Sequence, residues 1–405
     1  MRTVYPIGTT IYDPEKCYNG YSLYCIPQGR FLSPVILIDM NGNVVQKWNV
    51  GGYAWHTCRA KLLNNGNLLV LEMKKGERQS GPREYSWDGH LVWEYEPWRL
   101  PEFQLPIKAA GYAGAHHDIS RLENGNTLIL CREEVPEEYK EKIKDPVRRN
   151  VRPLLSDLIL EVTPDKEVVW EWHMYQHLDI NRYCEICSPI DWTHTNTARV
   201  LPENKWYDAG DERFKPGNII LSPRNLSFIL LVDKTTKEIV WEYIGDYAGG
   251  LAGQHEPHMI EKGLPGEGNI IIFDNGAPPM RSLAHAGKTF ILEIDPVTKK
   301  IVWMYDHGQI FHSAFRSSVQ RLPNGNTFIC SAEESRLFEV TREGEIVWEY
   351  IIEWNIGFGS PRANRYSYDY CPQLRDLEKP EEKKVVPPPH VVTRPRTGWQ
   401  ERLPA

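Results

Sequence analysis

Histidine is the residue type that recurs where this chain could do chemistry. Of its thirteen histidines, seven stand just before or at the start of segments that read as β-hairpins. They are His56, His116, His117, His194, His255, His258 and His312. Imidazole titrates near neutral pH, so it can act as a base, a nucleophile or a metal ligand. These positions predict a histidine-lined site, provided that the fold brings them together.

The elements that must position these histidines repeat along the chain. Apolar hairpins end in tryptophan six times, at Trp48, Trp93, Trp170, Trp241, Trp303 and Trp348. Most are followed by a second hairpin with an Asn-Gly turn, such as ISRLENGNTLIL at 119–130. Asn and Gly tolerate the positive φ that tight hairpin turns need, so this pattern is a strong hairpin signal. Each unit is predicted to contain about four antiparallel strands.

Recurring four-stranded units are typical of a β-propeller. We expect an all-β, six-bladed β-propeller with four-stranded antiparallel blades over residues 1–377, closed by pairing of 20–26 or a nearby strand with the last blade. Loop insertions are expected at about 97–115, 133–151 and 173–215, and 378–405 reads as a Pro-rich charged tail that is disordered or wraps the surface. Since innermost strands line the central channel, the histidines should gather at one mouth.

Composition excludes several other classes of function. The net charge is −7 and the basic residues form no stripe, so nucleic acid is not an expected partner. No apolar run could span a membrane and the start lacks a secretory signal, which favours a cytoplasmic location, or a periplasmic one for a trimmed mature form. A small molecule is the expected partner, and a homodimer is compatible with the sequence. The eight dilute cysteines predict reduced thiols.

Five short motifs occur in order: DWTH at 191–194, SPRN at 222–225, GQH at 253–255, FDNG at 273–276 and RANRYSYDY at 362–370. Together they resemble the bacterial arylsulfotransferases that do not use phosphoadenosine phosphosulfate. The resemblance implies a six-bladed propeller that moves a sulfuryl group from one phenol ester to another phenol through a sulfohistidine, without a cofactor. It also implies that His194 and His255 flank the sulfuryl group and that Arg281 neutralises it. His312 is the best candidate for the nucleophile, with Ser313 or Arg316 as alternatives for that place.

Sulfuryl transfer spreads negative charge over three oxygens, so fixed cationic donors suit it. Arginine is always charged and fork-shaped, and Arg224 and Asn196 could supply further donors near the same mouth. The substrate contacts expected from the sequence are His56, His116, His117, His258, Asn196, Arg224, Tyr112 and Arg365. Which of His255 and His258 faces the substrate is left open.

Three other interpretations use different chemistry. The axial histidines could bind a transition metal, or act as acid and base, in a lyase or hydrolase. A separate cluster of His173, His177, Cys184 and Cys187 has ligand types suited to zinc, although a polar loop with two free thiols explains it as well. A non-catalytic binding propeller is the third interpretation.

Overall fold

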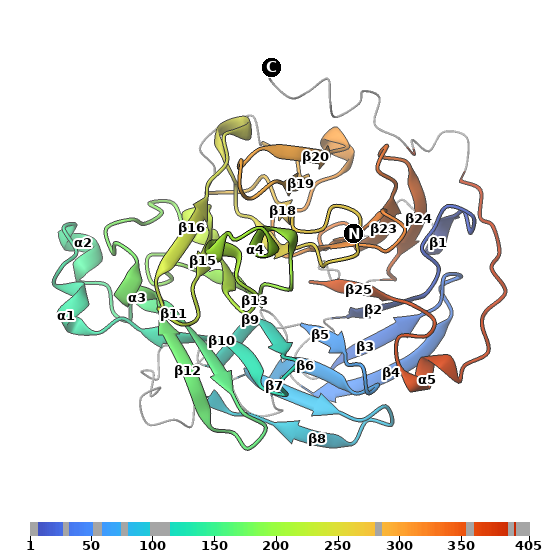
Figure 1. Cartoon of the computed structure of the whole chain (residues 1–405), viewed down its shortest axis with the longest axis horizontal. Helices are drawn as coiled ribbons and strands as arrows, with labels where there is room; N and C mark the ends of the chain where they lie inside the picture. The colour runs from blue at the N-terminus through green and yellow to red at the C-terminus, as the bar shows by residue number, and fades with distance from the viewer. Residues whose placement is uncertain are drawn as a thin grey trace.

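The structure is a computed structural model that describes residues 7–26, 32–51, 59–73, 80–97, 114–279, 286–353, 360–387 and 393. It is an all-β propeller built from four-stranded antiparallel sheets arranged around a central axis (Figure 1). No helix in the described part of the chain is long and apolar enough to cross a membrane.

The two ends of the chain close the ring. One sheet runs in the order β25 (Ala363–Tyr366), β2 (Tyr21–Cys25), β3 (Leu32–Ile38) and β4 (Val44–Gly51). The last sheet runs in the order β21 (Ser318–Arg321), β22 (Thr327–Ser331), β23 (Arg336–Val340), β24 (Ile346–Ile351) and β1 (Gly8–Tyr12). The expected closure by N-terminal strands is confirmed, because β2 pairs with β25 and β1 pairs with β24.

The remaining strands form three sheets. An eight-stranded sheet contains β5 (Ala60–Leu62), β6 (Leu68–Met73), β7 (Ser80–Tyr85), β8 (Leu91–Glu94), β9 (Gly114–Arg121), β10 (Thr127–Glu134), β11 (Leu155–Val162) and β12 (Val168–His173). Two four-stranded sheets contain β13 (Thr195–Val200), β14 (Ile219–Pro223), β15 (Ile229–Val232) and β16 (Ile239–Tyr243), and β17 (His255–Met259), β18 (Ile270–Asp274), β19 (Phe290–Ile294) and β20 (Ile301–Tyr305).

The number of sheets differs from the expected six blades. The described strands form five hydrogen-bonded sheets, because β5–β8 and β9–β12 are merged into one. The merger consists of a single parallel bridge between Ser80 and Gly114, whereas the pairing within each half is antiparallel. The four-stranded antiparallel architecture is confirmed, and the count of six separate sheets is not.

The repeated tryptophans connect neighbouring hairpins around the ring. Each indole N–H donates to a backbone carbonyl in the turn between the third and fourth strands of the next group, over 2.7 to 3.2 Å. The pairs are Trp48 with Ser86, Trp93 with Pro164, Trp170 with Lys234, Trp241 with Pro296, Trp303 with Arg342, and Trp348 with Met40. The last pair returns to the first hairpin, so these tryptophans link neighbouring groups of strands around the whole ring.

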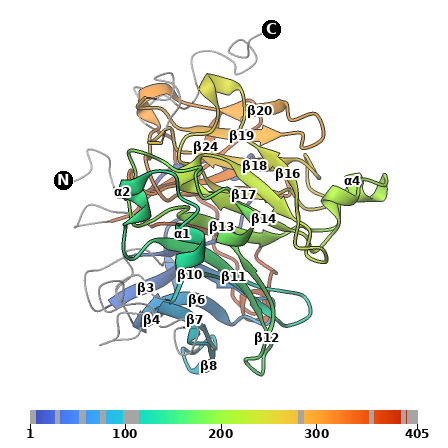
Figure 2. The same ribbon diagram turned by 90° about the vertical axis from the view of Figure 1, so that its left-hand side faces the viewer.

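Short helices lie in the connections. They are α1 (Glu137–Lys140), α2 (Pro146–Arg149), α3 (Met174–His177), α4 (Lys205–Asp208) and α5 (Pro372–Arg375), with 3₁₀ turns η4 (Glu212–Phe214), η5 (Arg224–Leu226), η6 (Tyr247–Gly249) and η8 (Gly308–Ile310). The start of the tail follows the surface, because the backbone of Val385 exchanges hydrogen bonds with Tyr12 and Thr393 accepts one from Ile346. Figure 2 places α4 and α2 on opposite faces of the ring.

A buried ionic network occupies the centre of the ring. Arg59 lies 2.9 Å from Glu256 and 3.2 Å from Asp118, and Arg362 lies 2.5 Å from Glu256. Arg199 also pairs with Glu256. Paired charges of this kind tolerate burial only while every partner is present. Asp118 and Glu256 lie within β9 and β17, so the network crosses the axis between the two ends of the innermost strands.

Candidate active site

The predicted histidines meet where the innermost strands begin. His116 and His117 lie in β9, His194 directly precedes β13 and His255 is the first residue of β17. The backbone enters the left-handed region at corresponding points, with φ of 58° at His117, 46° at His194, 56° at Glu256 and 59° at Arg316. Such conformations cost energy in residues other than glycine and cluster at functional sites. The strained strand starts set the directions of the site's side chains.

His117, His116 and Asp157 of β11 follow one another in a chain of close polar contacts. His116 is buried, its Nε2 lies 3.0 Å from Asp157 Oδ1, and its Nδ1 lies 2.7 Å from His117 Nδ1. Burial lowers the pKa of His116, helped by Arg132 and opposed by Asp157, so the ring is neutral near pH 7. An ionised carboxylate only accepts, so the proton of His116 is placed on Nε2, facing Asp157, and its Nδ1 accepts from His117. This tautomer leaves the basic lone pair of a neutral His117 on Nε2.

His194 forms a second aspartate–histidine pair. Its Nδ1 lies 2.5 Å from Asp191 Oδ2, and Arg132 Nη2 lies 3.1 Å from the same oxygen. Burial alone would raise the pKa of Asp191, but Arg132 and His194 lower it well below its usual range, so the carboxylate stays ionised. The pair directs the other nitrogen of His194, Nε2, away from Asp191. The His194 ring packs edge-on against His117 with centroids 4.9 Å apart.

His255 is a buried, neutral ring with both nitrogens engaged. Its Nδ1 donates to Asn275 Oδ1 over 2.7 Å and to the Gly253 carbonyl over 3.0 Å, while its Nε2 accepts from the Arg316 backbone N–H over 3.2 Å. Burial lowers the pKa of His255 well below its ordinary value, and Arg224 and Arg362 lower it further. Asn275 also donates to the carbonyls of Ser313 and Arg316, which ties His255 to the loop before β21.

His312 lies in that same loop and is half-buried. Its Nδ1 lies 3.5 Å from Thr289 Oγ1, and its backbone N–H donates to Glu334 over 3.3 Å. Thr289 donates in turn to the Asn275 carbonyl over 3.1 Å. In the described part of the chain no hydrogen bond joins His312 directly to His194 or His255. The connection between them runs through Thr289 and Asn275.

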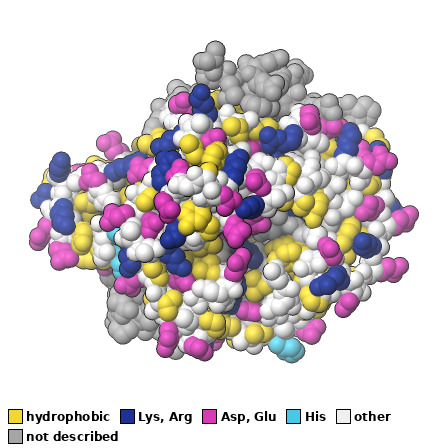
Figure 3. Space-filling model, in the orientation of Figure 1, with side chains coloured by type: hydrophobic (Ala, Val, Ile, Leu, Met, Phe, Trp, Pro, Cys, Tyr) yellow, Lys and Arg dark blue, Asp and Glu magenta, His cyan; other side chains and the backbone are white. Residues whose placement is uncertain are grey.

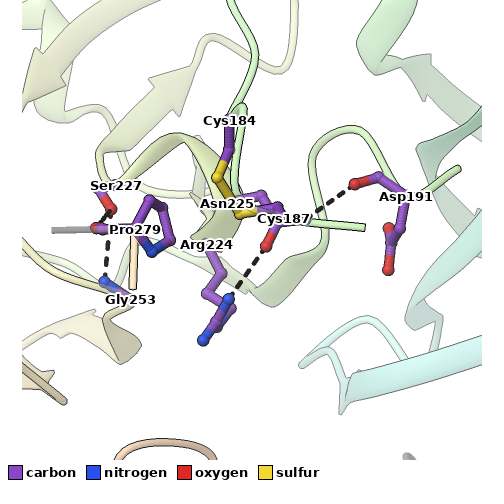
Figure 4. The surroundings of a disulfide bond; sticks show 8 residues. All are labelled: Cys184, Cys187, Asp191, Arg224, Asn225, Ser227, Gly253 and Pro279. Carbon is purple, nitrogen blue, oxygen red and sulfur yellow. Dashed lines mark hydrogen bonds between the residues drawn. A yellow bond between two sulfur atoms is a disulfide. The ribbon is translucent and has the colours of Figure 1, made fainter. Parts of the chain in front are cut away.

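Arg224 supplies a cation at the rim of the site. Figure 4 shows its guanidinium beneath a disulfide, with Nη1 donating to Asn225 Oδ1 over 3.1 Å, and Asn225 donating to the Asp191 carbonyl over 2.8 Å. Burial lowers the pKa of Arg224, and Asp191 opposes the shift. Gly253 permits this close packing: its φ is +68°, and a Cβ there would lie 3.1 Å from the Ala277 carbonyl and 3.5 Å from Arg224 Nη2.

The disulfide joins Cys184 to Cys187, so the expectation of reduced thiols is wrong for these two. Their Cα atoms lie 5.4 Å apart, within the range that a disulfide can bridge. The sequence signal was too weak, because a Cys-x2-Cys spacing serves both metal ligands and disulfides. His173 instead pairs with Glu133 and His177 stacks on Trp172, so the four residues do not form the zinc cluster considered from the sequence.

Three of the other predicted substrate contacts lie away from this mouth or are hydrogen-bonded within the sheets. Arg365 is fully buried between sheets, where it donates to Ser22 and Tyr18, pairs with Glu339 and stacks on Trp348. His258 lines the opposite mouth, away from His255, and its Nδ1 lies 2.9 Å from the Glu256 carbonyl. Asn196 is buried and donates to the Gln254 carbonyl. His56, Tyr112 and Arg281 lie outside the described residues.

Several site residues were missed by the sequence reasoning. Asp191 stands inside DWTH and Asn275 inside FDNG, so the motifs that carried the histidines also contained their partners. Asp157 is a charged residue in the middle of the fully buried strand LSDLILEV, which is itself a signal. Arg132 had no such signal. Within the described ranges, no group of three or more His, Cys, Asp and Glu residues is arranged to hold a metal ion.

The family model described as Arylsulfotransferase (ASST) matches residues 105–353, which is more than half of the chain. The chain therefore belongs to the arylsulfotransferase (ASST) family. No curated protein matches it.

The solved structures that match this chain are distant from it in sequence. A protein of unknown function from Bacteroides caccae is 14% identical with a TM-score of 0.49, covering 85% of this chain and 98% of that one. A streptogramin B lyase is 11% identical with a TM-score of 0.43, covering 89% and 98%. A catalytically inactive virginiamycin B lyase from Staphylococcus aureus is 10% identical with a TM-score of 0.42, covering 86% and 89%. Similarities this distant carry no argument about function.

Proposed function

We propose that this protein is a sulfotransferase that moves a sulfuryl group from an aryl sulfate ester to a phenolic acceptor through a sulfohistidine. Family membership supports a transferase. The observation that carries the proposal is the convergence of imidazoles and guanidiniums from neighbouring strands and loops at one mouth. This set comprises His116, His117, His194, His255, Arg132 and Arg224. Fixed cations beside neutral imidazoles suit a loose transition state that carries charge on three oxygens.

His312 is proposed as the nucleophile. His255 uses both ring nitrogens in hydrogen bonds, and the nitrogens of His116 face Asp157 and His117. His194 and His117 belong to aspartate-linked chains that suit proton transfer. His312 is the ring outside these pairs. Its lone pair attacks sulfur, and the ester S–O bond breaks with its electrons going to the leaving phenolate.

Proton transfer is assigned to the Asp191–His194 pair. His194 donates a proton to the departing phenolate oxygen and then accepts one from the incoming phenol. That phenol's oxygen attacks sulfur, the S–N bond breaks, and its electron pair returns to His312. Arg224, and Arg281 from outside the described residues, are proposed to neutralise the sulfuryl oxygens. This route needs no cofactor.

The test uses p-nitrophenyl [³⁵S]sulfate as donor and excess phenol as acceptor. We expect p-nitrophenol release that depends on phenol, formation of labelled phenyl sulfate, and label trapped on a histidine peptide when phenol is omitted. Absence of donor turnover would overturn the proposal. So would release of free sulfate at a rate that ignores the acceptor.

Replacing Asp191 with Asn should lower kcat for transfer by about 10² or more, because the amide no longer fixes the His194 tautomer or stabilises its protonated form. The measurement is steady-state transfer from p-nitrophenyl sulfate. Asp179→Asn, on a carboxylate outside the site, is the matched control and should retain wild-type kcat. An Asp191→Asn variant with unchanged kcat would remove His194 from proton transfer.

A second candidate function uses the same residues for acid–base hydrolysis or elimination without sulfuryl transfer. The two aspartate–histidine chains favour it, since such pairs serve as general acids and bases. In that case the ³⁵S assay would show no labelled protein.

We also infer that the ring has six blades. The eight-stranded sheet then counts as two, because only the Ser80–Gly114 bridge joins its halves. Six tryptophan indoles each reaching the next hairpin support this count.

A further inference from the structure

A large pocket opens at the mouth opposite the histidine site, where the innermost strands end. Its volume is about 1070 Å³, just above the range of about 300 to 1,000 Å³ typical of small-molecule sites. Figure 3 shows this face in the orientation of Figure 1. The buried network of Arg59, Asp118, Glu256 and Arg362 lies between this pocket and the candidate active site. The pocket is therefore separate from the candidate active site.

Six polar side chains line this pocket, one from each innermost strand. They are Lys61, Ser120, Arg199, His258, Gln320 and Asn364. Side chains two positions apart on a β-strand point to the same side. Lys61 follows Arg59 by two positions and His258 follows Glu256 by two, so these pocket side chains point toward the axis as the buried ionic network does. The floor of the pocket therefore holds donors and positive charge, and none of these six side chains is a carboxylate.

The floor of the pocket and the ionic network beneath it together carry more positive than negative groups. Arg59, Arg199, Arg362 and Lys61 are cationic, and the carboxylates that meet them are Asp118 and Glu256. A further carboxylate that lines the pocket, Glu84, already pairs with Arg121, and Glu123 and Glu261 stand exposed at the rim. Buried charge is stable when it is paired, so the excess favours an anion in the pocket.

Lys61 is the cation placed to meet such an anion. Its Nζ donates to Ser120 Oγ over 2.7 Å, and that neutral hydroxyl leaves two of its three donor positions for other acceptors. Burial lowers the pKa of Lys61 to about 8, with Arg59 and Arg362 acting in the same direction and Asp118 and Glu256 opposing them. Arg199 Nε, 3.8 Å from Asp118, meets no acceptor in hydrogen-bonding geometry among the described residues.

We propose that this second mouth is an anion-binding pocket that takes a small oxyanion, either free or as the carboxylate, sulfate or phosphate group of an organic molecule. Lys61 and Arg199 contact the anion, and Ser120, Gln320 and Asn364 supply polar contacts around it. This anion-binding pocket lies on the opposite side of the buried ionic network from the candidate active site. Its proposal does not depend on the sulfotransferase proposal.

The test is calorimetric titration of the full chain at constant ionic strength, balanced with sodium chloride, using sulfate and benzoate as separate probes. Saturable binding of sulfate alone indicates a free oxyanion, and tighter binding of benzoate indicates an organic one. Lys61→Gln should weaken binding at least about tenfold, and Gln320→Glu, which adds a negative charge to the floor, should do the same. Lys262→Gln, on an exposed lysine paired with Asp208, is the control and should bind like the wild type.

Sulfate could also enter the sulfuryl site, so Arg224→Gln is titrated in parallel. Binding at the second mouth should survive this substitution. The proposal is overturned if neither probe saturates, if both floor variants bind as tightly as the wild type, or if Arg224→Gln alone removes the binding. Circular dichroism of each variant verifies that the fold is retained.

Discussion

His312→Gln is expected to reduce sulfuryl transfer from p-nitrophenyl sulfate to phenol by at least about 10³-fold. Glutamine keeps a polar side chain of similar length but has no nitrogen lone pair that can attack sulfur. Because the nucleophile forms the covalent intermediate, the variant should also lose the trapped ³⁵S label. Its loss separates a nucleophile from a residue that merely orders the loop, which would lower the rate while still accepting label.

His90→Gln is the matched control for this substitution. His90 is exposed in the turn between β7 and β8, away from the candidate active site, so transfer should remain within about twofold of the wild type. If the His312→Gln protein still became labelled, another histidine would be the nucleophile. His194 would then be the first to replace, because its Nε2 is the basic nitrogen of an aspartate-linked imidazole.

Much of the fold follows from local signals in the sequence. The Asn-Gly turn at 124–125 joins β9 to β10, and the terminal tryptophans lie on the fourth strand of each group, as the repeats predict. These signals act over a few residues. The merging of two four-stranded groups depends on one bridge between Ser80 and Gly114, a long-range contact that no short pattern encodes. The positions of hairpins are therefore more predictable than the hydrogen bonds that join one group of strands to the next.

The site was predictable in its residue types and less so in its directions. The sequence places His258 as close to the predicted mouth as His255, yet a strand carries successive residues along the axis, and three residues move a side chain to the other end. The direction of Arg365 was likewise not evident from the sequence, because its guanidinium lies between two sheets, where it pairs with Glu339. Disulfide formation between Cys184 and Cys187 depends on a loop whose path only the three-dimensional fold determines.

Glu256→Gln should produce the largest loss of stability, about 3 to 5 kcal/mol in the free energy of unfolding. Glu256 contacts Arg59, Arg362 and Arg199 inside the ring. Removing its charge leaves these guanidinium groups with only Asp118 as a carboxylate partner in the central network. Equilibrium unfolding in urea measures the effect.

The surface pair of Lys16 and Glu345 provides the control. Their side chains are 46% and 21% exposed, and water screens their attraction, so Glu345→Gln should cost less than about 1 kcal/mol. A Glu256→Gln protein as stable as this control would show that the axial charges do not hold the sheets together.

The same substitution makes a prediction about pH. Burial by itself would raise the pKa of Glu256, but Arg362 and Arg59 lower it from 4.5 to about 2. A carboxylate with a lowered folded-state pKa stabilises the protein above its unfolded-state pKa, and this contribution is lost as the pH falls toward the folded-state value. The wild type should therefore lose about 3 kcal/mol from this group between pH 4.5 and about 2. Glu256→Gln should show a correspondingly shallower pH dependence there, because the amide has no proton to gain, and equal slopes would place the acid sensitivity elsewhere.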